Sequence, residues 1–370
     1  MRLDIERLER AKSRLGEAVL DPGQWPSLME AICAAAATTG AALLQSDIRT
    51  PDVPVTPSVQ AFFKAYFKNN LHVGDIRAAK GVPLLLAGRQ AIRDQDLFSS
   101  ERSMLSDPLY AHAASFGMRW WSAISFRSGS ALWALALQRS IREGMFEDDE
   151  MRIVASLSEC LTDVATLSQA VGRQVLLGSL NAFELINRPA LSMSRAGLVI
   201  EMNRAATDMF DADFRVRHNR LYMRDGKASQ ALELMLGQRP ADGEIKARSR
   251  GRVGNIIVAR RESKKPILIK VLPVHGAATT PFLGAHAVLT FRDLETEPRP
   301  SLEMLAEAFA LTAAEARVAS MIATGLSPEE VAGELQVSRE TVRNQIKAIF
   351  AKTGAHRQSE LAALVSRIQV

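Results

Sequence analysis

The sequence contains very little cysteine and no long apolar run. Cys33 and Cys160 are its only cysteines, and they lie far apart, so they provide no disulfide framework and no metal-binding cluster. The longest apolar stretch, residues 31–44, is interrupted by two threonines and a glycine and is too short to cross a bilayer. The N-terminus is charged and lacks the apolar core of a signal peptide. We therefore expect a cytoplasmic protein that does not enter the membrane.

Sequence patterns typical of enzymes are also missing. We find no pairing of a nucleophile with a base, no metal cluster and no glycine-rich phosphate loop, so we expect no catalysis, no cofactor and no metal. The 370 residues are 47% hydrophobic and 24% charged, which is ordinary for a globular protein of two or three domains. The net charge of +5 is compatible with nucleic-acid binding but is weak evidence for it.

The most informative stretch is near the C-terminus, where short helices carry their own start and stop signals. Thr312 with Glu315 forms a capping box at the start of one helix, which ends at Gly325. Ser327 with Glu330 forms a second capping box at the start of the next helix. Two short helices joined by so brief a connection predict a helix-turn-helix.

A third helix follows, capped by Ser338, and its faces differ. Val342, Ile346 and Ile349 recur at helical spacing, so we expect them to pack on the first two helices. A cationic face carrying an amide suits the major groove of DNA, although a merely solvated surface is the alternative. That face consists of Arg339, Arg343, Asn344 and Lys347.

These features resemble the LuxR-type (GerE-like) helix-turn-helix of bacterial transcription regulators. The resemblance is carried by Leu311–Glu315, Gly325–Ser327, Ser338–Arg343 and Ile349–Gly354 and spans roughly the last 60 residues. It implies a four-helix unit over residues 302–370 that dimerises through its last helix, residues 357–368. The apolar residues of that helix are Leu361, Leu364 and Val365.

The same resemblance implies which residues contact DNA. The family very often has histidine where this chain has Gln345, and a glutamine still donates to a phosphate or reads adenine. The implied partners are double-stranded DNA and a second copy of the chain, with RNA polymerase as a further candidate. The base-facing positions are Arg339, Arg343, Asn344 and Lys347, and the phosphate-facing positions are Ser338, Thr341, Gln345, Lys352 and Arg357.

Residues 1–170 have the pattern of a sensor domain. Two strands followed by a helix that begins at Phe146-Glu-Asp-Asp149 resemble the end of a GAF-type domain, and the autoinducer-binding domains of quorum-sensing regulators share this order of elements. Those receptors carry Trp-x-x-x-Tyr and then Asp-Pro, whereas this chain has Phe62, Tyr66 and then Asp75-Ile76. We therefore infer no acyl-homoserine lactone. The helices expected here span residues 3–20, 25–39, 58–67, 97–116 (with interruptions) and 147–177, and the strands 41–45, 83–86, 119–126 and 132–138.

An aromatic group in this region is a candidate pocket for an unknown small molecule. Aromatic residues in strands more often form core, so both interpretations stay open. Trp120 and Trp121 are neighbours in a strand and should point to opposite faces. The candidates are Tyr110, Phe116, Trp120, Trp121 and Trp133.

The long helix over 147–177 carries an apolar stripe at near-heptad spacing, from Ile153 to Val175. Two interpretations are open: a helix that packs on its own sheet, and a connector that forms a dimer.

Residues 178–293 resemble a PAS domain. A strand, a turn and a strand lead to Asn203, and an alanine-rich short helix follows. The region contains no cysteine, and its three histidines are isolated, so no flavin or haem is indicated. The helices expected are 180–187, 203–210 and 228–236, and the strands are 191–193, 198–202, 244–248, 255–260, 267–274 and 285–292.

The predicted fold is therefore an α+β multidomain chain. It has a GAF-like α/β domain at 1–170, a PAS-like antiparallel-sheet domain at 178–293 and an all-α LuxR-type unit at 302–370. The predicted function is a bacterial transcription regulator that binds DNA as a dimer under the control of its sensory domains. The alternative is an orphan receptor, similar to quorum-sensing receptors, that binds a small-molecule autoinducer.

Overall fold

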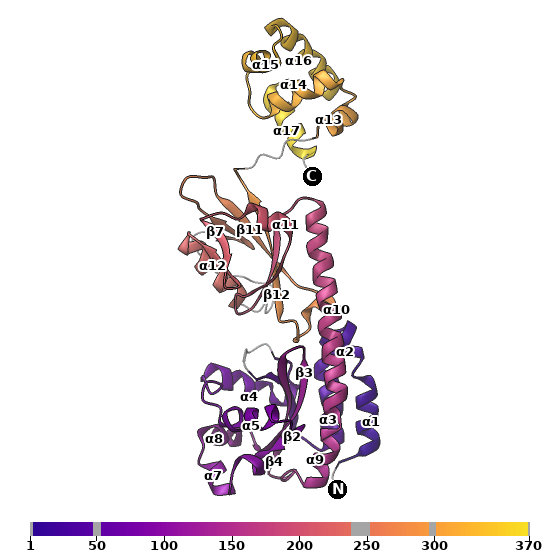
Figure 1. The fold of residues 1–370 in the computed structure, drawn as a ribbon, viewed down its shortest axis with the longest axis vertical. Helices are drawn as coiled ribbons and strands as arrows, with labels where there is room; N and C mark the ends of the chain where they lie inside the picture. The colour runs from indigo at the N-terminus through magenta and orange to yellow at the C-terminus, as the bar shows by residue number, and fades with distance from the viewer. Residues whose placement is uncertain (1–2, 47–52, 238–251, 296–300, 369–370) are drawn as a thin grey trace.

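The computed structural model describes residues 3–46, 53–237, 252–295 and 301–368. Figure 1 shows three lobes that follow one another along the long axis, with one helix, α10, running beside the first two. We call them the first lobe, the second lobe and the C-terminal unit. Within the described residues, no helix combines the length and the apolar character needed to span a membrane.

The first lobe is built on a four-stranded antiparallel sheet with helices on both faces. One face packs on α1, α3 and α10, and the other on α4, α5 and α8. Trp120 belongs to the first core and Trp121 to the second, as expected for neighbours in a strand. The strand order is β1(Gly40–Gln45)-β4(Ala131–Ser140)-β3(Met118–Ser128)-β2(Ala91–Arg93). The helices are α1(Ile5–Arg14), α2(Glu17–Leu20), η1(Pro22–Gln24), α3(Trp25–Ala36), α4(Pro57–Lys68), α5(Ile76–Leu86), α6(Asp94–Leu97), α7(Glu101–Leu105), α8(Pro108–Ser115) and α9(Asp148–Ala155).

Three local predictions for the first lobe were wrong. The single helix expected over 147–177 is divided at Ser156 into α9 and α10. Residues 83–86 form the last turn of α5, not a strand, because Asp75 caps a helix that continues through Pro83. A short apolar run does not by itself distinguish a strand from a helix. The single helix expected over 3–20 is divided at Leu15–Gly16 into α1 and α2.

The long helix α10 (Leu157–Leu185) joins the first two lobes. The sequence predicts one helix that ends at residue 177 and another from 180 to 187, but the two are continuous. An interior glycine costs a helix only about 1 kcal/mol, and burial of Leu176 and Leu180 on either side of Gly178 offsets that cost. The boundary between the lobes therefore lies inside one helix.

The second lobe has a six-stranded antiparallel sheet with α10 against it. A hairpin of β7 and β8 was not predicted. Its turn residues, His218 and Asn219, both have positive φ (49° and 56°), as a two-residue hairpin turn requires. The predicted strand 244–248 lies outside the described residues. The strand order is β6(Val199–Met202)-β5(Ala190–Ser194)-β12(Ala285–Asp293)-β11(Ile267–Pro273)-β10(Ile256–Ala259)-β9(Arg252–Val253). The remaining elements are α11(Arg204–Met209), β7(Phe214–Arg217), β8(Arg220–Met223), α12(Gly226–Gly237) and η2(Gly276–Thr279).

Phe282, between η2 and β12, fixes the second lobe to the first. Its ring lies edge-on to Trp25, Phe126 and Trp133, with centroid separations of 5.5, 5.8 and 5.1 Å. Gln169 of α10 donates a hydrogen bond from Nε2 to the carbonyl of Phe282 (3.1 Å). One residue of the second lobe thus completes the core of the first.

The C-terminal unit contains five described helices, one more than the family resemblance implies. The added helix, α13, buries Leu305 against the others. The helices are α13(Leu302–Phe309), α14(Ala313–Ala323), α15(Pro328–Leu335), α16(Arg339–Thr353) and α17(Gln358–Ile368).

Replacing Phe282 with alanine should lower the free energy of unfolding of the first lobe by about 3–5 kcal/mol, because a buried phenylalanine is lost from a packed cluster. All four tryptophans (residues 25, 120, 121 and 133) lie in this lobe, so their fluorescence during urea unfolding reports its stability. Phe116→Ala is the matched control, since Phe116 is 38% exposed. Equal losses in the two variants would show that Phe282 does not stabilise the first lobe.

Candidate nucleic-acid interface and a buried cavity

The helix starts of the C-terminal unit have the geometry that the sequence predicts. Thr312 N donates to Glu315 Oε2 (2.7 Å), and Glu315 N donates to Thr312 Oγ1 (3.3 Å). Ser327 and Glu330 make the same reciprocal pair at 2.7 and 3.3 Å. These boxes satisfy backbone donors that a helix start otherwise leaves free. They fix where α14 and α15 begin.

The turn between α15 and α16 sets the direction of α16. Gln336 adopts the left-handed conformation (φ 53°) at the end of α15. Ser338 then accepts from Thr341 N (3.0 Å) and starts α16. Two helices joined by a turn of this length form a helix-turn-helix.

The faces of α16 are divided as predicted. Val342 and Ile349 are fully buried and Ile346 is half-buried in the core of the unit. Within the described residues, the polar face of α16 is exposed, and none of its cations is paired with a carboxylate. Its residues, all exposed, are Arg339, Arg343, Asn344 and Lys347.

The predicted phosphate-facing residues are spread along α16 and just beyond it. Ser338 and Thr341 are exposed at its start, Gln345 is half-buried in the middle, and Arg357 is exposed after its end. Lys352 lies about 20 Å along the helix from Ser338, at 1.5 Å per residue. Its Nζ forms an ion pair with Glu315 Oε2 (2.7 Å), a contact that the sequence did not suggest.

The apolar residues of α17 serve the core of the unit. Leu361 and Val365 are 0% and 1% exposed and belong to the core that α17 shares with α14 and α13. Of the three apolar residues predicted for the dimer contact, Leu364 alone is half-buried. Dimerisation through this helix therefore stays a prediction, and the face expected for it is largely occupied.

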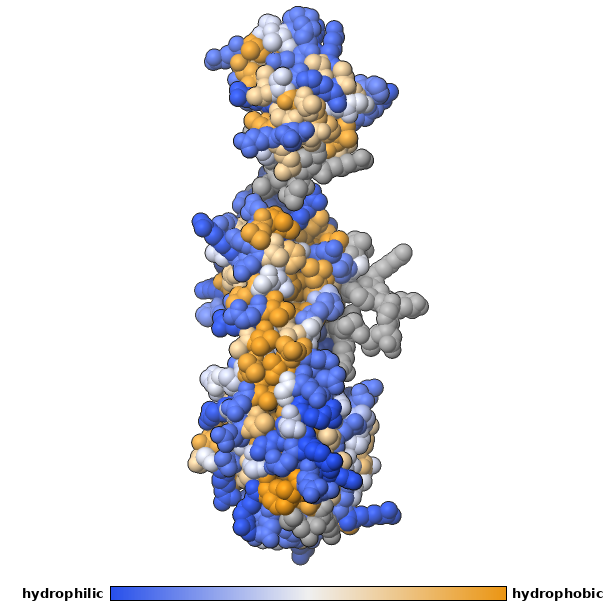
Figure 2. All heavy atoms as spheres, turned by 90° about the vertical axis from the view of Figure 1, so that its right-hand side faces the viewer, coloured by the Kyte–Doolittle hydropathy of each residue, from blue (hydrophilic) through white to orange (hydrophobic). Residues whose placement is uncertain are grey.

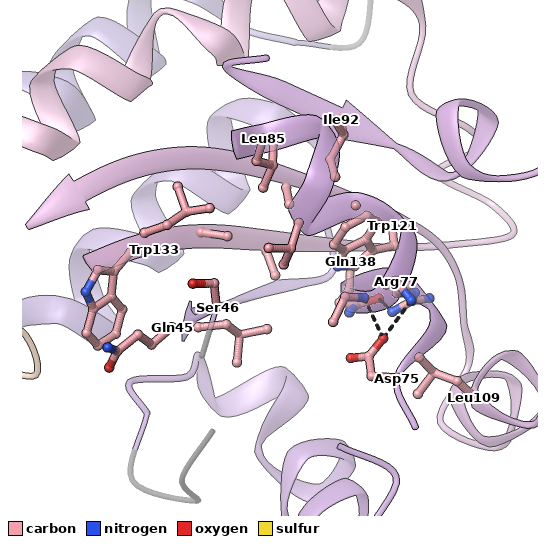
Figure 3. Close-up of a pocket in the computed structure, with 18 of the residues that line it drawn as sticks. Gln45, Ser46, Asp75, Arg77, Leu85, Ile92, Leu109, Trp121, Trp133 and Gln138 are labelled. Atoms are coloured by element: carbon pink, nitrogen blue, oxygen red, sulfur yellow. Dashed lines mark hydrogen bonds between the residues drawn. The ribbon is translucent and has the colours of Figure 1, made fainter. Parts of the chain in front are cut away.

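A cavity lies in the first lobe, between the sheet and helices α4 and α5 (Figure 3). Trp121 and Trp133 line it, whereas the other three residues of the predicted pocket lie elsewhere. Trp120 is on the opposite face of the sheet. Phe116 is 38% exposed and packs on Phe62. Tyr110 is buried beside the cavity in a polar network.

This polar network was missed at the sequence level. Arg77 Nε donates to Tyr110 Oη (3.1 Å), and Tyr110 Oη in turn donates to Asp94. Asp94 also accepts from the backbone of Trp121 (2.7 Å). Burial raises the pKa of the Asp94 carboxyl, and the nearby guanidinium of Arg77 opposes that rise. The only local signal is Asp75, which caps α5 through the amides of Arg77 and Ala78.

Glu315→Gln should remove an acid-sensitive part of the stability of the C-terminal unit. The hydrogen bond from Lys352, and after it the one from Thr312 N, lowers the pKa of Glu315. A lowered pKa stabilises the folded state above the unfolded value of about 4.3, and this contribution disappears as the pH falls through the folded value.

Amide hydrogen exchange of α14 in the full chain, followed from about pH 6 to about pH 3, measures this effect. The parent should lose more protection than Glu315→Gln over that range. Glu307→Gln, at an exposed position of α13, should behave like the parent. If Glu315→Gln behaves like the parent as well, the pair with Lys352 adds nothing to folding.

Comparison with known proteins identifies the C-terminal unit. Two solved structures share weak overall similarity with the chain. The phage VqmA–DPO complex is 14% identical, with 52% of this chain and 88% of that chain covered and a TM-score of 0.22. The E. coli DhaR(N)–DhaL complex is 10% identical, with 77% and 87% covered and a TM-score of 0.20. Neither score supports an argument, and no curated protein matches. Residues 310–365, however, match the bacterial regulatory proteins of the luxR family. This part of the chain is a LuxR-type helix-turn-helix domain.

Proposed function

We propose that the protein is a bacterial transcription regulator, acting in the cytoplasm, that places α16 in the major groove of DNA. The observation that carries the proposal is the family match over residues 310–365. The exposed cations of α16 add a physical reason, because Arg343 and Lys347 lie one turn apart on an exposed face, turned by about 100–140° from the buried Val342. The proposal includes no catalytic step.

We assign direct base contacts to the face of α16. Arginine and lysine favour the acceptor edge of guanine, and the amide of Asn344 suits adenine. The exposed hydroxyls of Ser338 and Thr341 lie at the N-terminus of α16, where backbone amides also favour a phosphate. Lys352 would have to leave Glu315 before its ammonium group could pair with a DNA phosphate. RNA polymerase is a further proposed partner.

We propose that the first two lobes are GAF-like and PAS-like sensors. The first lobe has an antiparallel sheet covered by helices on both faces, and the second has an antiparallel sheet against α10. A signal in either lobe acts only by binding one arrangement of the chain better than another. A receptor for a small-molecule autoinducer is the second candidate function, because the first lobe contains a cavity.

The protein should act as a dimer, because one recognition helix reads only a few base pairs. Figure 2 shows an apolar band along α10 on the face turned to the viewer. Leu167 is 54% exposed and Leu185 is 88% exposed. Successive positions on a helix turn by about 100°, which places the whole band within an arc of about 80°. We call this band the α10 stripe; its residues are Leu167, Val171, Val175, Gly178, Ala182 and Leu185.

We assign the α10 stripe to a second copy of the chain in parallel orientation. A parallel two-fold pairing aligns each stripe with itself and leaves both C-terminal units at the same end of the molecule (Figure 1). An antiparallel pairing would carry them to opposite ends, whereas half-sites on DNA lie about 34 Å apart. The stripe is about 27 Å long at 1.5 Å per residue, which is enough for a coiled-coil contact.

Arg343→Ala should weaken binding to the preferred DNA by about 1–3 kcal/mol and relax the preference at one base position. Binding to a set of DNA duplexes with each position varied in turn measures both effects. Arg317→Ala is the control, because it removes the same charge from an exposed position of α14. The face assignment fails if Arg343→Ala binds every duplex as the parent does.

Leu167→Glu should dissociate the dimer, since it places a charge in the N-terminal part of the apolar contact. Sedimentation equilibrium should find twice 40.5 kDa for the parent and a single chain mass for the variant at the same concentration. Leu234→Glu changes a leucine of α12 that is 48% exposed and should stay dimeric. A monomeric parent, or a dimeric Leu167→Glu, rules out the α10 stripe as the interface.

A further inference from the structure

The cavity of the first lobe has an apolar middle and polar residues at both ends. Leu85 and Ile92 belong to its apolar lining. Figure 3 places Gln45 and Ser46 near Trp133 at one end, and Arg77 and Gln138 beside Trp121 at the other end. The cavity volume is about 50 Å³, whereas one water needs roughly 10–15 Å³ and a cavity of about 150 Å³ binds benzene. The cavity therefore has room for a molecule of a few heavy atoms, not only for a single water.

Arg77 has a buried donor without a partner at this end. Its side chain is 4% exposed. Nε donates to Tyr110 Oη (3.1 Å), and Nη1 donates to Gln138 Oε1 at 3.4 Å. Nη2 is buried and has no hydrogen-bond partner. A buried donor that is left unsatisfied carries its full desolvation cost, so a third acceptor is expected there.

The surroundings of Arg77 determine what kind of acceptor fits. Within the described residues no carboxylate lies at ion-pair distance, and Tyr110 separates the guanidinium from Asp94. Asp94 nevertheless lies close to this guanidinium. Adding a ligand carboxylate would bring a second like charge into a buried site. An uncharged oxygen fits the charge balance better.

We propose that this cavity binds a small, mostly apolar molecule with an uncharged carbonyl group, whose oxygen accepts a hydrogen bond from Arg77 Nη2. The apolar body would lie against Leu85, Ile92 and the ring of Trp121. The proposal concerns the first lobe alone and does not depend on DNA binding.

Matched pairs of small compounds test this proposal on the full-length protein. Acetamide with acetate and propanamide with propanoate share an apolar body and differ in the charge at the polar end. Isothermal titration measures binding, and quenching of the tryptophan fluorescence checks that the compound reaches Trp121 and Trp133. At least one amide should bind, and its carboxylate should bind roughly ten-fold more weakly or worse.

Three variants locate the site. Arg77→Gln should weaken amide binding by roughly ten-fold or more, because a hydrogen bond from a charged donor is lost. Ala136→Leu adds bulk at a position that lines the cavity and should abolish binding. Arg102→Gln, at an exposed position of α7, should bind as the parent does. If Arg77→Gln does not fold, Ala136→Leu and the difference between amide and carboxylate still show whether the cavity is the binding site.

Three results overturn the proposal: no amide binds the parent, the carboxylate binds as tightly as its amide, or Ala136→Leu binds as the parent does. Failure of DNA recognition would instead appear as unaltered DNA binding in Arg343→Ala, with the amide titrations unaffected. The two hypotheses therefore fail independently.

Discussion

The shared helix α10 is the constraint on which the arrangement of the first two lobes depends. Its N-terminal half buries Leu161 and Ala165 in the first core, and its C-terminal half buries Leu176 and Leu180 against the second sheet. Between them, a Cβ at Gly172 would lie 2.7 Å from the carbonyl oxygen of Ala277, so the helix and η2 meet more closely than another residue allows. Together with Phe282, these contacts join the two lobes along one continuous helix. Because α10 packs against both lobes, a conformational change in one lobe would act on the same helix that supports the other.

The cavity lies next to this joint. Trp133 lines one end of the cavity, and its ring packs edge-on against Phe282 of the second lobe at 5.1 Å. A molecule that moved Trp133 would have to repack Phe282, because close-packed interiors do not deform smoothly. Under the proposed sensor function, this residue pair is the place at which a change in the first lobe would act on the second. The α10 stripe lies on the exposed side of the helix that joins the two lobes. A rearrangement of Trp133 and Phe282 would therefore also affect the proposed dimer contact.

The accuracy of the sequence-based predictions follows how local each signal is. The C-terminal unit was predicted almost helix by helix, because each capping box lies within four residues, as for Thr312 with Glu315. The strand predicted at 83–86 was wrong, since four apolar residues carry too little periodicity. The break expected near Gly178 is absent because burial on both sides outweighs a weak local preference. Arg77 was missed for a different reason: its partners come from α8 and β4, and only the folded chain brings them together.

The pair between Lys352 and Glu315 limits how the C-terminal unit can read DNA. Glu315 caps α14, and through Lys352 it also holds the end of α16. A phosphate that attracts Lys352 must replace an existing carboxylate, so the net electrostatic gain at this position is the difference between two similar contacts. The cations for which the described residues provide no such partner, Arg339, Arg343 and Lys347, would bring their full charge to the proposed groove contact. Affinity and base preference should therefore both be concentrated on the first half of α16, while its far end serves mainly to keep the helix in place.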